Sequence, residues 1–449
     1  MNAPQSATQL VDDHYLLLEP ERKYTQAFCT AEEITIAGHI RDFVNKELMP
    51  HRHALEGGWH RDETLAKETL HRLYAKLVDL GVTRTNLPEK FGGLAYSPVV
   101  RQMINEELSR ADIGLATKVG KIHWIVSVML AAGREDLLEE FAPRIVGEDS
   151  WTACMAITEP AGGANVEDPA LEFRTVKTIA KEDGDHYVIN GHKLWPGPSG
   201  YADHFRSQHL KGHLGYWVVA TTDPARGAEG AGIFYVPADA EGLEFSNPYQ
   251  KMGFSWTESN SDIWFNNVRI PRRYRVDTKP GQGAQIINGF IIGLGRLAGA
   301  ARLVGLADAV LEICLNWTRH RIIAGTSMRE RSMFAGMLAE MYRAIDLSRQ
   351  YYLSTTWQVT RADLYGAPWS KEMKAKFSCA RSYAGDTAQM VCNRAMELMG
   401  AAGYAYESHV EKYMRDYKIV QMWLGGAQRD RLDIAQGLYG PFKWAGSEF

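Results

Sequence analysis

The hydrophobic pattern of the chain changes its period twice. Apolar residues recur at helical spacing from Glu32 to Leu48 and from Ile113 to Ala132. Between Trp151 and Pro271 the period falls to two, in runs such as Phe173 to Ile179 that Gly, Asp and Asn separate. After Gly289 the helical spacing returns and persists. The sequence therefore predicts an α+β fold in which a β-domain lies between two helical domains.

These changes divide the chain into parts. Leu303, Leu306 and Val310 mark one face of a long C-terminal helix, and short loops between such helices predict an antiparallel bundle. We predict a lead-in at 1–29, an N-terminal helical domain at 30–150, a central β-domain at 151–275, a C-terminal helical bundle at 276–440 and a tail at 441–449.

The composition excludes several classes of protein. Lys and Arg number 50 against 54 Asp and Glu, so the charge offers no basic face for nucleic acid. Five cysteines without C-x-x-C spacing argue against a disulfide framework and a zinc site, and favour a reducing, cytoplasmic location. No histidine belongs to an H-E-x-x-H pattern, so we assign no metal. The chain has neither a run of about eighteen apolar residues nor a basic-then-apolar leader, so we expect no membrane span.

The first half of the β-domain carries two local signals. Tyr187 to Ile189 meet Asn190-Gly191, a dipeptide suited to a two-residue hairpin turn, which predicts that the chain reverses there. Ile157 and Thr158 precede Glu159-Pro160 and a glycine-rich bend. Backbone groups and the Thr158 hydroxyl are therefore expected to face a flat polar ligand, with a nearby tryptophan as its wall.

These motifs resemble those of a known family. The pattern I-T-E-P-x-x-G-x-N from Ile157 and Y-V-I-N-G-x-K-x-W from Tyr187 resemble the flavin-contacting strands of the acyl-CoA dehydrogenase superfamily. Further matches occur at 86–94, 251–271 and 400–419, so the resemblance covers about residues 30–440. It implies an N-terminal helical domain, a central β-barrel or sandwich and a C-terminal four-helix bundle. It also implies FAD between the last two domains and an acyl-CoA substrate.

The resemblance implies which residues hold FAD. Arg321 and Gly325 match an R-x-x-x-G element whose arginine reaches the FAD pyrophosphate of a neighbouring subunit, a task that suits a planar guanidinium. A solvated arginine at a helix end is the alternative. Glycines would let backbone amides approach the flavin phosphates. The implied cofactor-binding residues are Ile157, Thr158, Ala164, Trp195, Gly197, Arg321, Gly400, Gly403 and Gln428.

Three further patterns carry expectations. Gly197 stands where the family commonly has a hydroxyl that approaches the flavin N5 edge, so that hydroxyl is missing. Arg415-Asp416 is expected to form an ion pair that locks helices. Gly293 to Ala298 matches the dinucleotide fingerprint superficially, but no parallel-sheet strand precedes it, so its small residues are expected to permit close helix packing.

The family's catalytic base is missing. In the ordinary member a Y-E-G-T run carries the glutamate that removes the substrate's α-proton, and here Leu424 occupies that position. Some branches place the glutamate immediately before an arginine that is Arg296 here, and that position is Gly295. A positioned base contributes about 10²–10⁴ in rate, or roughly 3–5 kcal/mol of barrier. The catalytic residue is therefore unknown from the sequence.

Other charged residues lie near the helix that lines the acyl pocket in the family. Glu106, Glu107 and Asp112 are candidates for recruitment as a base, although we favour surface carboxylates. Lys118 and Lys121 are predicted to lie on a solvated helix face.

The sequence leaves three functions open. The first is a FAD-dependent oxidoreductase of the acyl-CoA dehydrogenase type with a non-standard proton-abstraction step, a homotetramer that passes electrons to an electron-transfer flavoprotein or a similar acceptor. The second is a flavin-containing lyase that loses carboxylate or sulfinate from an acyl-CoA. The third is a non-catalytic subunit that pairs with an active paralogue.

Overall fold

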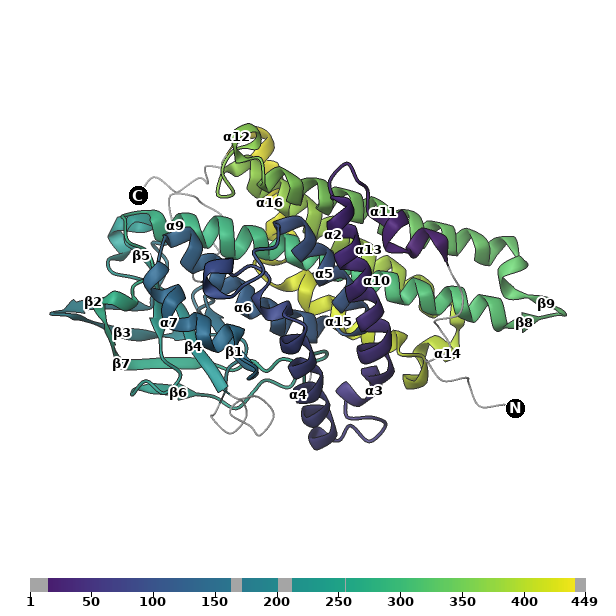
Figure 1. Ribbon diagram of the computed structural model, residues 1–449, viewed down its shortest axis with the longest axis horizontal. Helices are drawn as coiled ribbons and strands as arrows, with labels where there is room; N and C mark the ends of the chain where they lie inside the picture. The colour runs from purple at the N-terminus through teal and green to yellow at the C-terminus, as the bar shows by residue number, and fades with distance from the viewer. Residues whose placement is uncertain (1–14, 163–171, 201–211, 255, 441–449) are drawn as a thin grey trace.

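The computed structural model describes residues 15–162, 172–200, 212–254 and 256–440. The sheet lies at one end of an elongated molecule, and long C-terminal helices run from it to the opposite end (Figure 1). The N-terminal helices cross the middle. The predicted α+β fold, with an N-terminal helical part, a central sheet and a C-terminal helical part, is confirmed.

Local signals explain where the N-terminal helices begin and end. Thr30 forms a capping box with Glu33 at the start of α2, which continues into a π-helical turn at Val44–Leu48. The Asp112 carboxylate accepts a hydrogen bond from the Leu115 N–H at 2.7 Å and so begins α6. The helices are α1 (Pro20–Lys23), α2 (Ala31–Phe43), α3 (Arg52–Leu55), α4 (Glu63–Asp79), α5 (Pro98–Ala111), α6 (Ile113–Ala132) and α7 (Glu135–Val146).

One seven-stranded sheet forms the central part, in the order β1-β4-β2-β3-β7-β6 with β5 paired to β4. On β4, Trp217 and Val219 enter a core shared with α6 and α7, whereas Tyr216 and Val218 enter a second core on the other face. The sheet is therefore apolar on both faces. The strands are β1 (Trp151–Ala156), β2 (Ile179–Asp183), β3 (His186–Lys193), β4 (Gly212–Thr221), β5 (Ala231–Val236), β6 (Leu243–Phe245) and β7 (Ile263–Pro271).

Two local predictions for the sheet are wrong. Asn190-Gly191 forms no turn, because β3 continues through it and the β2–β3 hairpin turns at Gly184-Asp185. Strands β2 and β7 pair with β3 on its two sides and keep the dipeptide extended. Gly191 is needed for a different reason, since a Cβ there would lie 2.5 Å from the Thr178 hydroxyl oxygen. The strand predicted from Phe173 begins only at Ile179.

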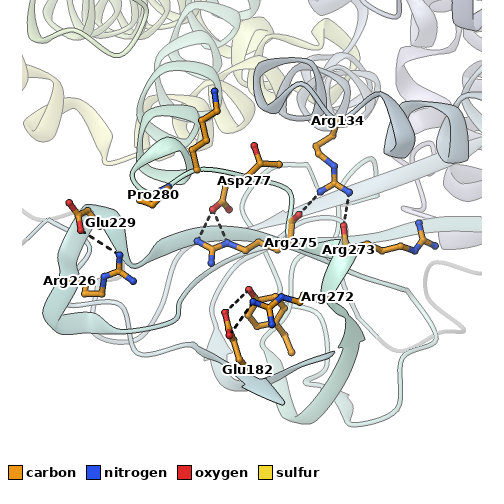
Figure 2. A pocket seen from close by; sticks show the side chains of 12 residues that line it. Arg134, Glu182, Arg226, Glu229, Arg272, Arg273, Arg275, Asp277 and Pro280 are labelled. Carbon is orange, nitrogen blue, oxygen red and sulfur yellow. Dashed lines mark hydrogen bonds and ion pairs between the residues drawn. The ribbon is translucent and has the colours of Figure 1, made fainter. Parts of the chain in front are cut away.

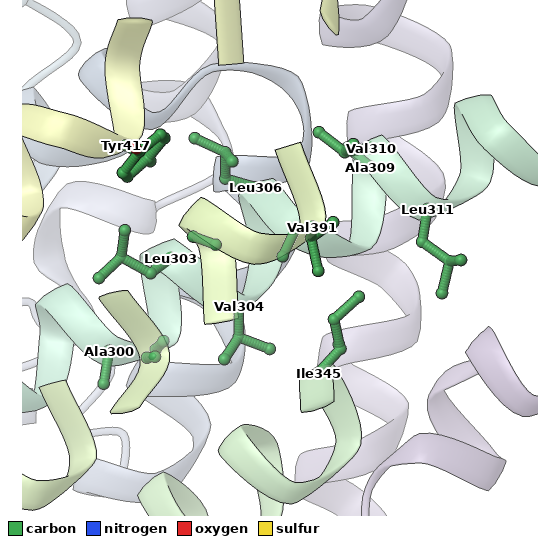
Figure 3. Close-up of a cluster of buried hydrophobic side chains, with 14 of the residues drawn as sticks. Ala300, Leu303, Val304, Leu306, Ala309, Val310, Leu311, Ile345, Val391 and Tyr417 are labelled. Atoms are coloured by element: carbon green, nitrogen blue, oxygen red, sulfur yellow. The ribbon is translucent and has the colours of Figure 1, made fainter. Parts of the chain in front are cut away.

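The C-terminal helices pack around α10. Figure 3 shows Leu303, Val304 and Leu306 of α10 in one cluster with Ile345 of α11 and Val391 of α13. The elements are α9 (Gln282–Ile286), a π-helical segment (Ile287–Gly293), α10 (Leu294–His320), β8 (Ile322–Ile323), β9 (Thr326–Ser327), α11 (Ser332–Val359), α12 (Ala362–Tyr365), α13 (Lys371–Met399), α14 (Ala401–Tyr404), α15 (Val410–Met422) and α16 (Gly426–Tyr439).

Two helical stretches are long and apolar enough to cross a membrane, Ile113–Ala132 and Gln282–His320. Their most apolar windows are 78% and 83% buried within the protein. Both stretches are therefore core helices of this fold: α6 lies between the sheet and the other helices, and α10 forms the centre of the bundle.

A buried ion network joins the N-terminal helices to the bundle. Lys23 Nζ lies 2.9 Å from Glu106, 2.5 Å from Glu107 and 3.0 Å from Asp308. Glu106 and Glu107 are fully buried, so their prediction as surface carboxylates is wrong. The reason is that this side of α5 faces cations of three other elements and not water. The buried members are four cations and four carboxylates: Lys23, Arg41, Arg110, Arg349, Glu106, Glu107, Asp308 and Glu312.

A second network corrects two more predictions. Asp112 is fully buried and lies 2.6 Å from Lys412, so it is not a surface carboxylate either. Arg415 pairs with Glu56 at 2.5 Å and with Glu411 at 2.7 Å. Asp416 pairs with Lys412 instead of Arg415. The expected Arg415–Asp416 pair is therefore wrong, because adjacent residues on a helix point in different directions.

We expect Glu107→Gln to lower the free energy of unfolding by about 3–5 kcal/mol at neutral pH, because it leaves Lys23, Arg41 and Arg110 short of a counter-charge. Burial alone would raise the pKa of Glu107, but these three cations outweigh it and hold the pKa below its usual value. The difference in the free energy of unfolding between the wild type and the variant should therefore have its full value above about pH 4.3. It should disappear as the pH falls through the lowered pKa.

Urea denaturation across this pH range measures the effect. The control is Glu135→Gln, because the Glu135 side chain is 65% exposed in its pair with Lys90. That variant should lose at most about 1 kcal/mol. Equal losses in the two variants would contradict the assignment of Glu107 to a buried, charge-balanced network.

Candidate active site

Gly295 and Leu424, the two positions where the resemblance leads us to expect a catalytic base, meet in space. A Cβ on Gly295 would lie 2.7 Å from Leu424 Cδ1 and 3.0 Å from Trp124 Cζ2. Residues from α10, from the loop before α16 and from α6 therefore converge on one point, which we call the Gly295–Leu424 slot. Its wall is apolar, and no carboxylate occupies either position.

Two buried arginines hold the loop that carries Leu424. An Arg296 Nη donates to the Leu424 carbonyl at 3.0 Å, and Arg381 donates to the Trp423 carbonyl and, at 3.0 Å, to that of Gly426. The loop is fixed although Leu424 has a positive φ of 49°, a strained value for a leucine. Asp430 and Asp433 neutralise the guanidinium groups. This arrangement determines where the Leu424 side chain points.

Cations surround the slot. Lys121 Nζ lies 5.2 Å from the centre of the Trp124 ring, and the Arg302 guanidinium lies 5.9 Å from that of Trp423. Lys118 and Lys121 are 2% and 9% exposed, so their predicted solvated position is wrong. The reason is that α6 is enclosed on nearly every side by β1, α5, α10 and the preceding helices.

Sequence reasoning missed Glu258, which lies in the loop after the K-M-G motif. This glutamate is 3% exposed and pairs with Lys121 at 3.0 Å. A Cβ on Gly197 would overlap Glu258 Oε1 and Asn260 Nδ2, so the carboxylate takes the space that a side chain at 197 would occupy. Burial opposes ionisation, but Lys121, Lys118 and Lys251 lower the pKa of Glu258 below its usual value. No spacing in the sequence indicates this contact.

The end of β1 forms a second part of the site. Thr158 is exposed and Ile157 is half-buried, while the Lys193 ammonium donates to the Ile157 carbonyl at 3.0 Å and to Glu159 at 2.7 Å. Trp195 is 45% exposed and stacks on Tyr249 with ring centres 4.1 Å apart. An exposed hydroxyl beside an exposed indole fits a planar polar ligand such as an isoalloxazine ring.

The other predicted cofactor residues lie elsewhere. Arg321 is exposed at the β8–β9 hairpin, which projects from the end of the molecule opposite the sheet (Figure 1). Gly400 ends α13 with a φ of 60° and open space around its Cβ position, and Gly403 packs against Met396. Gln428 is exposed on α16. Within one chain these residues do not join Thr158 and Trp195. Ala164 lies outside the described residues.

The glycines of the rejected dinucleotide pattern act as expected. A Cβ on Gly293 would lie 2.7 Å from the Phe377 ring, so the residue permits close packing of α13.

All five cysteines are free. Within the described ranges, no group of three His, Cys, Asp or Glu side chains is placed to hold a metal ion.

A hollow of about 410 Å³ lies on the sheet's side of the molecule and is lined by arginines (Figure 2). Arg272 pairs with Glu182 at 3.2 Å, and Arg275 pairs with Asp277 at 2.8 Å. The other lining arginines, Arg134, Arg226 and Arg273, have acidic partners of their own. Because these charges are matched, we assign this hollow no ligand.

The three-part fold defines the class of protein: two helical parts on either side of one β-sheet. Three family models match in order: acyl-CoA dehydrogenase, N-terminal domain, at residues 30–149, the middle domain at 154–268, and the C-terminal domain at 281–439. The chain therefore belongs to the acyl-CoA dehydrogenase family, and the expected family and enzyme class are confirmed.

Similar proteins span nearly the whole chain. The cyclohex-1-ene-1-carbonyl-CoA dehydrogenase of Geobacter metallireducens is 27% identical over 92% of this chain and 99% of its own length. FadE25 of Mycobacterium tuberculosis, named a probable acyl-CoA dehydrogenase, is 28% identical over 89% and 93%. The structure of butyryl-CoA dehydrogenase from Megasphaera elsdenii has a TM-score of 0.75 at 23% identity, covering 91% and 98%, which supports the fold alone.

We expect Lys193→Met to destabilise the end of β1. The change keeps the apolar stem but leaves the buried Glu159 without a cation, at a cost of about 3–5 kcal/mol. Hydrogen exchange should accelerate at the amides of residues 152–159. The matched control is Lys177→Met, whose side chain is exposed, and it should exchange like the wild type. Unchanged exchange in Lys193→Met would contradict this role.

Proposed function

We propose that the protein is a FAD-dependent enzyme that acts on an acyl-CoA thioester. The observation that carries the proposal is the convergence of Gly295, Leu424 and Trp124 on one apolar slot in a member of this family. When bound, FAD would supply a hydride acceptor for the acyl β-carbon. Ile157, Thr158 and Trp195 would contact the flavin ring, and Arg321, Gly400, Gly403 and Gln428 would serve the cofactor of a neighbouring subunit. The proposed oxidant is an electron-transfer flavoprotein or a similar acceptor, in the cytoplasm.

The apolar slot restricts how a proton can leave the substrate. Neither Gly295 nor Leu424 can accept a proton, and Glu106, Glu107 and Asp112 are engaged in buried ion pairs. We infer that the reaction does not use an α-proton base at the slot. The Leu424 side chain would then shield the substrate's α-carbon from water and from competing bases.

The second candidate is a lyase in which an acyl-CoA loses carboxylate or sulfinate. The buried cations around the slot favour it, because such a substrate has an anionic group next to the reacting carbons. The bond from carbon to the carboxylate or sulfinate group would break, CO2 or SO2 would leave, and the electron pair left on carbon would take a proton from water, so no proton acceptor is needed.

A ligand screen tests the proposal. The purified protein should carry an absorption band near 450 nm, and a panel of acyl-CoAs should bleach it. The product's mass distinguishes loss of two hydrogens from loss of carboxylate or sulfinate. Protein without this band even after FAD is supplied would favour a non-catalytic subunit.

We expect Leu424→Glu to reduce the turnover of the best wild-type substrate by more than about tenfold, because a charged, hydrated group would replace the apolar side chain that faces the acyl group, at a cost of more than about 1.4 kcal/mol. Stopped-flow flavin reduction measures the change. Leu424→Met conserves volume without charge and should retain most of the activity. If Leu424→Glu instead creates rapid dehydrogenation of a straight-chain acyl-CoA, the native reaction requires a base at the slot.

We expect Arg321→Ala to weaken FAD retention about 10- to 150-fold, which is the equivalent of a charge-assisted bond of about 1.5–3 kcal/mol. The exposed apolar residues Ile322 and Tyr404, 58% and 79% exposed, support burial of this end against another subunit of a homotetramer. Flavin content after dilution measures retention, with the exposed Arg361→Ala as control. A monomer by light scattering that keeps stoichiometric FAD would contradict the shared site.

A further inference from the structure

The charges around the Gly295–Leu424 slot do not balance. Lys118, Lys121 and Arg302 are buried, Lys251 is half-buried, and the anion that faces all four is Glu258. We call these five residues the slot cluster. Asp416 also acts on Lys251, so four cations against two carboxylates give a formal surplus of 4 − 2 = +2. The distant network around Lys23, built by the same chain, matches four cations with four carboxylates.

Two of these cations make no direct ion pair among the described residues, and Glu258 acts on them only from a distance. The Lys118 ammonium makes no hydrogen bond or ion pair there, although the residue is only 2% exposed. Arg302 is equally buried, and its Nε donates to Asn105 at 3.0 Å. Its terminal nitrogens lie against the α6 backbone at Gly120 and have no acceptor in the described ranges.

Burial is unfavourable for these charges. It lowers the pKa of Lys118, and it lowers that of Lys251 to about 8 and that of Arg302 to about 10, in each case against the opposing effect of Glu258. A buried cation without a partner loses its hydration and gains little in return. An anion that entered the cluster would restore the balance.

Under the proposed function the acyl group ends at the slot, and cations of the cluster border it. Trp124 forms the slot wall and carries Lys121 on its ring, while Trp423, next to Leu424, faces Arg302. The chain thus has cations around the two positions at which it lacks the family's carboxylate. Cations next to two positions without a carboxylate would suit an anion that arrives with the ligand.

We propose that the acyl group of the substrate carries its own carboxylate, which binds among Lys118, Lys121 and Arg302. This inference rests on the proposed function, and it names the class of substrate: a CoA thioester of a dicarboxylic acid. The carboxylate would accept hydrogen bonds from the Lys118 ammonium and the Arg302 guanidinium, which are charge-assisted and therefore strong. Glu258 would keep Lys121 oriented through its 3.0 Å ion pair.

Binding measurements test the proposal without relying on turnover. The rings of Trp124 and Trp423 lie next to Lys121 and Arg302 of the cluster, so tryptophan fluorescence of the holoenzyme should report ligand entry. The probes are an ω-carboxyacyl-CoA and its methyl ester, which has nearly the same shape without the charge. We expect the free acid to bind about 10- to 100-fold more tightly to the wild type, as one charge-assisted contact predicts.

The variants are Lys118→Met and Arg302→Gln, which should each bind the acid and the ester nearly equally. Lys46→Met is the control, because the Lys46 side chain is 83% exposed, and it should keep the wild-type preference. Equal or tighter binding of the ester to the wild type would overturn the inference, and this comparison needs no variant to fold. Variants that lose flavin but keep the preference would assign the cluster to the cofactor's phosphates and also overturn it.

The outcomes separate this inference from the proposed function. If the ester bleaches the flavin and binds as well as the acid, the protein is an acyl-CoA flavoenzyme whose substrate is neutral. If neither ligand binds and no acyl-CoA bleaches the flavin, both proposals fail.

Discussion

Close approach of other elements to helix α10 is the constraint on which the rest of the structure depends. A Cβ on Gly293 would meet Phe377 of α13, one on Gly295 would meet Leu424 and Trp124, and one on Gly299 would lie 3.1 Å from the Trp423 indole nitrogen. The helix bundle, the slot and its aromatic walls thus all require residues without side chains along one helix. Glycine lowers the intrinsic stability of a helix by up to about 1 kcal/mol, so the burial of α10 must offset that cost.

Electrostatics separates the structural part of the molecule from the candidate site. Around Lys23, buried cations and carboxylates are equal in number and within contact distance, as a network that joins five helices needs to be. In the clamp, Arg296 and Arg381 each have a carboxylate partner, Asp433 and Asp430 respectively. Around the slot, cations outnumber carboxylates in the described part of the chain. Such an imbalance indicates ligand binding more than stability.

The slot has no carboxylate at Gly295 or Leu424, but the loop around Leu424 is firmly held and charged groups lie nearby. Two buried arginines hold the loop, and Leu424 has a positive φ. Glu258 occupies the space beside Gly197 that a side chain there would take. The site thus combines an apolar slot with buried charged groups, and buried lysines without a function would only lower the stability of the chain.

The sequence by itself determined the succession of helical and β parts, the helices at Ala31–Phe43 and Ile113–Ala132, and the family, because the period of apolar residues and short motifs are local properties. It also identified Gly295 and Leu424 as positions without a base, although not their contact.

Only the tertiary structure decided the rest. Asn190-Gly191 stays extended because two strands pair with it, and Lys118, Glu107 and Asp112 are buried because other elements cover them. Partners distant in sequence set these environments, so neither the turn preference of a dipeptide nor the charge of a side chain predicts them. The encounter of Glu258 with Lys121 and Gly197 is of the same kind, since it depends on how a loop of the sheet packs on α6.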